Sequence, residues 1–154
     1  MSSQSIVVIA EHAEGQVRPV TYELAAFART LQTEIQSSDI KIIVIGDAID
    51  RMAEIITRKT GLSVFALYVP GLAGYSVEVH KNVLAEVLSE WRPSHVCAAH
   101  SSQGLDFALG LAVRLGAACI TCVEAIVKQG WLDYAQQIGR DVLDCKTPSH
   151  ELKL

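Results

Sequence analysis

The residues best suited to chemistry fall in two short polar stretches that each follow an apolar run. Glu11 and His12 come directly after 6–10, which is Ile-Val-Val-Ile-Ala, and a carboxylate beside an imidazole can act as an acid–base pair. The second stretch is 100–106, His-Ser-Ser-Gln-Gly-Leu-Asp, in which small polar residues precede an apolar helical pattern. Free backbone N–H groups at such a helix start can bind a phosphate. The two stretches therefore indicate either an acid–base pair or an anion site.

A structural role accounts for the same residues more simply. Ser101 or Ser102 can cap the helix that follows, and Asp106 can complement the helix dipole in its first turn. His12 and His100 could meet if their strands are neighbours, but polar residues at strand ends commonly just satisfy loop backbone groups. The sequence has no G-x-S-x-G nucleophile elbow, no G-x-G-x-x-G after the first strand and no P-loop motif. We therefore favour capping and predict no catalytic residues.

Four cysteines occur, and Cys119 and Cys122 form a C-x-x-C pair. A redox-active pair needs its first cysteine at a helix start, whereas this pair follows a helix inside an apolar run. A zinc site would need two further ligands at matching spacing, and the sequence shows none. We expect Cys119 and Cys122 to be buried structural thiols, and we predict no metal site.

Apolar runs and amphipathic patterns alternate along the chain. The predicted strands cover about 5–11, 40–45, 64–69, 95–99 and 118–123, and the predicted helices about 19–36, 49–60, 76–91 and 101–115. Near-continuous apolar strands favour a mostly parallel sheet covered by helices on both faces, a three-layer α/β/α fold. The last helix is apolar nearly all round, so we expect it to be well buried. Residues 124–138 suggest an added C-terminal antiparallel hairpin.

These elements predict where a ligand would bind. In open parallel sheets, ligands bind beyond the carboxyl ends of the strands, near the switch point of the topology. That rule selects Glu11, His12 and Ala13, then Gly46 and Asp47, and finally the stretch 100–106. The remaining histidines, His80, His95 and His150, are expected at the surface, and Trp91 and Trp131 are expected to serve packing.

Composition excludes several classes of protein. A chain of 154 residues with 50% hydrophobic and 19% charged residues predicts one globular domain, which we place at 1–139, with a tail at 140–154. The net charge of −4 and the absence of a basic run argue against a nucleic-acid partner. No apolar stretch reaches the roughly 20 residues of a membrane span, and 1–5 lack the features of a signal peptide. We expect a cytoplasmic protein with no membrane partner.

Several motifs, in order, resemble the electron transfer flavoprotein alpha subunit. Ile6–His12, then Val20-Thr-Tyr-Glu-Leu24 and Ala28-Arg-Thr-Leu31, look like the opening of that family. Tyr75-Ser-Val-Glu-Val-His80 matches the segment leading into the third helix, and Ser102–Leu115 resembles the signature after the fourth strand. The resemblance runs over roughly 5–125. One departure is Leu105, which stands where the family usually has an arginine beside Asp106.

The resemblance implies an adenine nucleotide alpha hydrolase-like fold and a role in electron transfer. In that family, FAD is held mainly by a separate C-terminal domain, so this chain is expected to be an excised N-terminal domain or a stand-alone relative that binds no FAD itself. The first domain packs against the beta subunit, and the related beta-subunit domain binds AMP in some members. By that analogy, Glu11, Gly46, Ser101, Ser102 and Gly104 would surround an adenine nucleotide.

Three hypotheses follow from the sequence. The leading one is an alpha-subunit N-terminal domain that is no enzyme by itself. It supports electron transfer from flavin dehydrogenases to a respiratory acceptor by assembling with the beta subunit. The alternative is a stand-alone adenine-nucleotide-binding module of the universal-stress type, with AMP as the ligand. The third is a structural homodimer.

Overall fold

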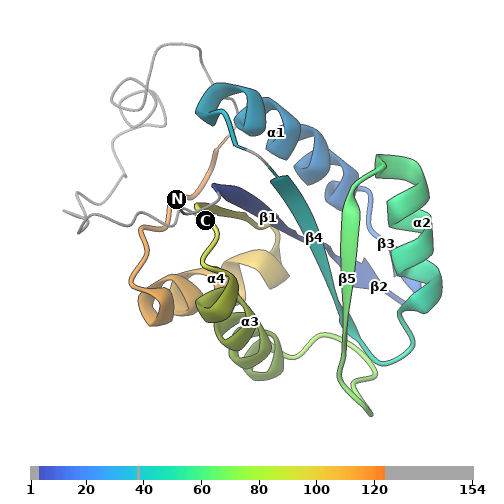
Figure 1. The fold of residues 1–154 in the computed structure, drawn as a ribbon. Helices are drawn as coiled ribbons and strands as arrows, with labels where there is room; N and C mark the ends of the chain where they lie inside the picture. The colour runs from blue at the N-terminus through green and yellow to red at the C-terminus, as the bar shows by residue number, and fades with distance from the viewer. Residues whose placement is uncertain (1–3, 38, 124–154) are drawn as a thin grey trace.

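Four parallel strands form the central sheet, in the order β5-β4-β1-β6 (Figure 1). The computed structural model describes residues 4–37 and 39–123. In it the strands are β1 (Ser5–Ile9), β4 (Asp39–Gly46), β5 (Ser63–Tyr68) and β6 (His95–Cys97). β1 lies inside the sheet, with Ser5 opposite Asp39 on β4 and Ile6 opposite His95 on β6. The first four predicted strands are confirmed, although β6 is shorter than the predicted 95–99.

Helices cover both faces of this sheet. They are α1 (Val20–Ile35), α2 (Asp50–Thr60), α3 (Val77–Trp91) and α4 (Ser102–Leu115). Figure 1 shows α1 and α2 on one side of the strands and α3 and α4 on the other. The predicted three-layer α/β/α fold with a parallel sheet is therefore confirmed.

Alternation along β1 divides the core into two apolar clusters. Ile6 and Val8 pack with α1 and α2, whereas Val7 and Ile9 pack with α3 and α4. Successive side chains of a strand point to opposite faces, so a strand covered on both faces must be apolar at every position. Burial of this kind is the main stabilising term of the fold, at about 25 cal/mol for each Å² removed from water.

The helix ends follow local sequence signals. Pro19 stands immediately before α1, and Gly61 ends α2 in the left-handed conformation, with φ of 67°. Ser101 caps α4 by accepting a hydrogen bond from the Gly104 N–H group. Trp91, at the end of α3, packs edge-on against Phe65 of β5 with ring centroids 4.7 Å apart. The predicted packing role of Trp91 and the predicted serine cap are both confirmed.

Two expectations about local structure are wrong. The predicted strand at 118–123 is reduced to a single bridge residue at Ala118. The second error concerns α4, which is not buried all round, because one side of it faces solvent. The stretch after β1 also forms a small antiparallel hairpin of β2 (His12–Ala13) and β3 (Gln16–Val17), which the sequence did not predict.

The exposed side of α4 carries an apolar stripe. Leu105, Leu109 and Val113 are 46%, 61% and 74% exposed. They recur every four residues, so they lie along one face of the helix. The opposite face, with Phe107 and Leu111, enters the core. The expectations for the hairpin at 124–138, the tail at 140–154, Trp131 and His150 lie outside the described residues.

Candidate functional site

The topology creates a switch point between β1 and β6. The chain passes from β1 through α1 on one face of the sheet, and from β6 into α4 on the opposite face. Because the two connections leave in opposite directions, the carboxyl ends of these neighbouring strands border the position where ligands bind in such sheets. Glu11 follows β1 and Ser101 follows β6, so the fold places both residues at this point.

The Glu11 backbone is fixed by the first turn of α1. Its N–H group donates to Thr21 Oγ1 at 2.9 Å, and the Thr21 hydroxyl donates to the Glu11 carbonyl at 3.0 Å. The Arg18 N–H group donates to the same carbonyl at 2.9 Å. Thr21 is fully buried, so these bonds hold the end of β1 against α1 without competition from water.

The Glu11 side chain turns toward α4. It is only 4% exposed, and its Oε1 atom accepts a hydrogen bond from the Ser101 hydroxyl. Its Oε2 atom accepts no hydrogen bond within the described part of the chain and lies 3.7 Å from Arg18 Nη1. Ser101 also accepts from the Gly104 N–H group at 3.1 Å. A buried carboxylate thus sits beside the N-terminus of α4, where the helix dipole favours a negative charge.

Gly104 allows the close approach of α4 to the end of β6. A Cβ atom at this position would lie 1.8 Å from the Ala99 carbonyl oxygen. Only a residue without a side chain fits there. Gly104 therefore determines how near Ser101 comes to Glu11.

His12 and Gly46 form a separate arrangement at the end of β4. His12 Nε2 lies 2.7 Å from the Ile45 carbonyl oxygen, to which it can donate. A Cβ atom at Gly46 would lie 3.4 Å from the His12 ring and 2.6 Å from Ile49 Cγ2, so Gly46 makes room for both side chains. Asp47 accepts a hydrogen bond from the Gly71 N–H group at 3.1 Å and fixes the loop after β5.

A third group lies between α3 and α4. Tyr75 donates its hydroxyl hydrogen bond to Asp106 Oδ2 at 3.1 Å, and its ring centroid is 4.8 Å from that of His80. Burial, the bond to Asp106 and the negative charges of Asp106 and Glu11 all raise the pKa of Tyr75. Burial lowers the pKa of His80, against the opposing effect of its 2.9 Å contact with the Ser76 carbonyl. The His12 charge lowers that pKa further.

The fold thus brings some of the predicted residues together and separates others. Glu11, Ser101 and Gly104 form one connected group. Gly46 belongs to the neighbouring His12 group, and Ser102 is exposed with no side-chain hydrogen bond inside the described residues. β1 and β6 are neighbours as the His12–His100 hypothesis required, but His12 bonds to the end of β4 and His100 contacts Cys122. No acid–base pair of these two histidines results.

Of the histidines expected at the surface, His95 is buried and His80 is partly buried. His95 is buried on β6, with its Nδ1 atom 3.0 Å from Ser94 Oγ, and His80 packs between Tyr75 and Phe107. The sequence reasoning also missed Thr21 and Tyr75. The burial of Thr21 could have been predicted from the sequence, because it precedes Ala25 and Ala28 at helical spacing on the apolar side of α1. No local sequence pattern indicates the role of Tyr75, since its partner Asp106 is 31 residues away.

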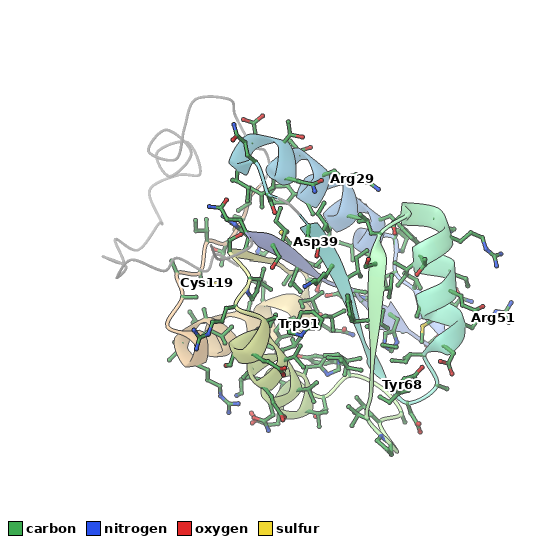
Figure 2. The ribbon with its side chains drawn as sticks, viewed as in Figure 1. Arg29, Asp39, Arg51, Tyr68, Trp91 and Cys119 are labelled. Atoms are coloured by element: carbon green, nitrogen blue, oxygen red, sulfur yellow. The ribbon has the colours of Figure 1, made fainter. Side chains whose placement is uncertain are left out.

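The expectation of two buried structural thiols is half wrong. Cys119 is partly buried, but Cys122 is exposed, because 118–123 is not a strand and does not enter the sheet. Cys97 on β6 is buried, and burial raises its pKa to about 12. Figure 2 shows Cys119 on the segment after α4. This segment, β6, α1 and α4 border a groove of about 460 Å³.

The described residues contain no cluster of three or more side chains able to hold a metal ion. None of the helices in the same part of the chain is long and apolar enough to cross a membrane. The switch-point group holds a carboxylate and a hydroxyl already bonded to each other, with the Arg18 guanidinium beside the carboxylate. Its hydrogen bonds join the end of β1 to α1 and to the start of α4.

Comparison with known proteins gives a family. Residues 6–137 match the sequence model of the family described as "Electron transfer flavoprotein domain". The chain belongs to this family. It is 29% identical over 111 residues to the lactate dehydrogenase (NAD(+),ferredoxin) subunit LctC of Acetobacterium woodii, covering 72% of the chain and 26% of that subunit.

Two similar proteins are electron transfer flavoprotein alpha subunits. The one from Bacillus subtilis is 25% identical over 112 residues, and the match covers 73% of this chain and 34% of the subunit. The one from Syntrophomonas wolfei is 24% identical over 108 residues, and the match covers 70% of this chain and 32% of the subunit. The match thus covers about a third or less of each relative. The predicted resemblance to the alpha subunit is confirmed, and the family supports a role of the electron transfer flavoprotein kind.

Proposed function

We propose that this chain acts as the N-terminal domain of an electron transfer flavoprotein alpha subunit. In this role it supports electron transfer from flavin dehydrogenases to a respiratory acceptor by assembling with a beta subunit. The family match over 6–137 is the observation that carries the proposal. The domain is no enzyme by itself on this view, and it works in the cytoplasm.

The residues at the switch point do not fit a flavin dinucleotide. A pyrophosphate at the N-terminus of α4 would meet the buried Glu11 carboxylate, which already occupies the position that the helix dipole favours. Asp106 adds a second negative charge nearby. No glycine-rich turn follows β1, since Ala10, Glu11 and His12 stand there. We therefore assign FAD binding to a part of the assembly other than this edge of the sheet.

The apolar stripe of α4 is the surface we assign to the beta subunit. Leu105, Leu109 and Val113 leave large side chains in water on one helix face, and contiguous exposed apolar residues typically mark a protein contact. The relatives named alpha subunits make a beta-type subunit the expected occupant. Apolar anchors of this kind contribute about 1–2 kcal/mol each to association.

Light scattering of this chain mixed with a beta-type electron transfer flavoprotein subunit from the same source tests the proposal. We expect a one-to-one complex that Leu109→Asp and Val113→Asp weaken by roughly tenfold each. Arg51→Asp is the matched control, because it changes charge on the outer side of α2, where Figure 2 shows Arg51 pointing away from the core. No complex at high protein concentration would refute the assembly role. Stoichiometric flavin uptake by this chain alone would refute the assignment of FAD elsewhere.

We propose AMP binding by Glu11, Gly46, Ser101, Ser102 and Gly104 as the second candidate function. Its support is the position of Glu11, Ser101 and Gly104 at the switch point of the sheet. The Glu11 carboxylate could accept hydrogen bonds from a ribose, while it would repel the phosphate. Calorimetry with AMP decides the matter, since no heat at millimolar ligand removes this candidate.

A further inference from the structure

The segment after α4 carries a thiol in contact with a histidine from a distant part of the chain. Cys122 Sγ lies 3.6 Å from His100 Nε2, within hydrogen-bonding reach for sulfur, and both side chains are exposed. His100 lies in the loop after β6, directly before Ser101, which caps α4. The tertiary fold alone joins the two, because they are 22 residues apart.

The histidine in contact with Cys122 directly precedes the start of α4. Cysteine thiols react as thiolates, and a histidine together with a helix N-terminus stabilises that form. The N-terminus of α4 begins one residue after its Ser101 cap and so lies close to His100. Glu23 of α1 is the carboxylate that borders the same groove, and Glu11 is already bonded to Ser101 and faces Arg18.

The groove gives the pair a place to receive a small molecule. It is about 460 Å³ in volume, and Cys119, Cys122 and His100 are among its lining residues. Its walls are mostly apolar, with Leu24 and Phe27 on α1 and Leu105 and Ala108 on α4. A volume in this range suits a small ligand. The thiol, the histidine and the groove thus form a site that adjoins the Glu11–Ser101 group at Gly104.

We propose that Cys122 undergoes thiol–disulfide exchange with low-molecular-weight disulfides, with His100 as the proton acceptor. The Cys122 S–H proton passes to His100 Nε2, and the thiolate forms a new S–S bond with one sulfur of the disulfide. The S–S bond of the small molecule breaks, and its other half leaves as a thiolate that takes up a proton. One protein thiol and one disulfide thus become one mixed disulfide and one free thiol. This proposal does not depend on the electron-transfer role.

The other described cysteines provide internal comparisons. Burial raises the pKa of Cys97 to about 12 and also raises the pKa of Cys119, so both thiols stay protonated at neutral pH. Cys122 is the exposed one of the three. Selective reaction at Cys122 is therefore the expected pattern.

The experiment uses the full chain with Cys145→Ser as the common background, so that the cysteine outside the described residues does not contribute. Release of thionitrobenzoate from 5,5′-dithiobis(2-nitrobenzoate) at pH 7 gives the rate, and mass spectrometry after exposure to oxidised glutathione gives the site. We expect one fast thiol, located at Cys122. Cys122→Ser abolishes the fast phase, whereas Cys119→Ser, which replaces the neighbouring thiol of the groove, retains a fast phase at Cys122.

His100→Asn tests the proton acceptor. We expect this variant to lower the rate constant of the fast phase on the order of tenfold, which is less than the rate loss typical of removing a general base from an enzyme. Far-UV circular dichroism and the urea midpoint verify that each variant is folded. A fast phase that survives in Cys122→Ser would overturn the proposal. If folded His100→Asn reacts at the unchanged fast rate, His100 is not the proton acceptor. That result would equally overturn the proposed site.

Discussion

Replacing Gly104 by alanine is the most direct test of how α4 meets the sheet. The new Cβ atom would lie 1.8 Å from the Ala99 carbonyl oxygen and 2.9 Å from the Ala99 carbonyl carbon. Real Cβ atoms essentially never come closer than 3.0 Å to a heavy atom outside their own and the adjacent residues, and both obstructing atoms are backbone. The start of α4 or the end of β6 must therefore move by more than about 1 Å to accept a single methyl group.

The expected loss of stability follows from the contacts that this movement disrupts. Overpacking a well-packed core costs about 1–3 kcal/mol. The start of α4 also carries the Ser101 cap and its bond to the buried Glu11 carboxylate, and losing a helix cap costs about 1 kcal/mol more. We expect Gly104→Ala to lower the free energy of unfolding by about 2–4 kcal/mol. With a urea slope of about 2 kcal/mol per molar, the midpoint falls by about 1–2 M.

Equilibrium unfolding in urea, followed by circular dichroism, measures this loss, and Gly110→Ala is the matched control on the same helix. Its Cβ atom would meet only the flexible side chain of Lys81, at 3.1 Å from Cδ. Alanine is favoured over glycine inside a helix by about 1 kcal/mol, so the control should be neutral or stabilising. If Gly104→Ala proves as stable as Gly110→Ala, the close approach of α4 to β6 is not what positions Ser101, and the account of the switch point is wrong.

Three further predictions concern neighbouring groups. Ser101→Ala should lower the free energy of unfolding by about 1–2 kcal/mol, because it removes the cap of α4 and the bond to Glu11. The control Ser102→Ala, at an exposed position, should change this free energy by less than about 0.5 kcal/mol. Equal urea midpoints for the two variants would contradict this prediction. The urea midpoint of Gly46→Ala should lie between those of Gly104→Ala and Gly110→Ala, because its Cβ atom would meet a side-chain atom, Ile49 Cγ2, at 2.6 Å. Burial lowers the pKa of His80 below 6.5, so the unfolded chain binds more protons than the folded one and stability falls as the pH drops below 6.5. His80→Gln should therefore reduce the slope of stability against pH between pH 6.5 and 5, and an unchanged slope would show that His80 does not contribute.

The order of elements could be predicted from the sequence because it depends on local patterns. Apolar runs such as 40–45 specify buried strands, and repeats at helical spacing with Gly61 at the end specify α2. The parallel three-layer fold then follows from the alternation of strands and helices. The motifs that resemble the alpha subunit are also local, and they indicated the family that the comparison with residues 6–137 confirms.

The errors arose where a short pattern has two physical solutions. The apolar stretch 118–123 has the composition of a strand, yet in the structure it lies along the groove and exposes Cys122. The apolar residues of α4 suggested full burial, but a helix on one face of a sheet buries one side only, and Leu109 and Val113 fall on the other. His80 and His95 looked like surface residues because the sequence does not show which side of an element faces the core.

The sequence by itself determined the four strands of the parallel sheet, the four helices and the family, because each depends on patterns within a few turns of chain. It also placed Glu11 and Ser101 at strand ends. Only the tertiary structure decided which polar groups meet. Strand order puts β1 beside β6 and so joins Glu11 to Ser101 across 90 residues, and the path after α4 brings Cys122 to His100. Contacts of this range depend on how whole layers pack, and no local pattern encodes them.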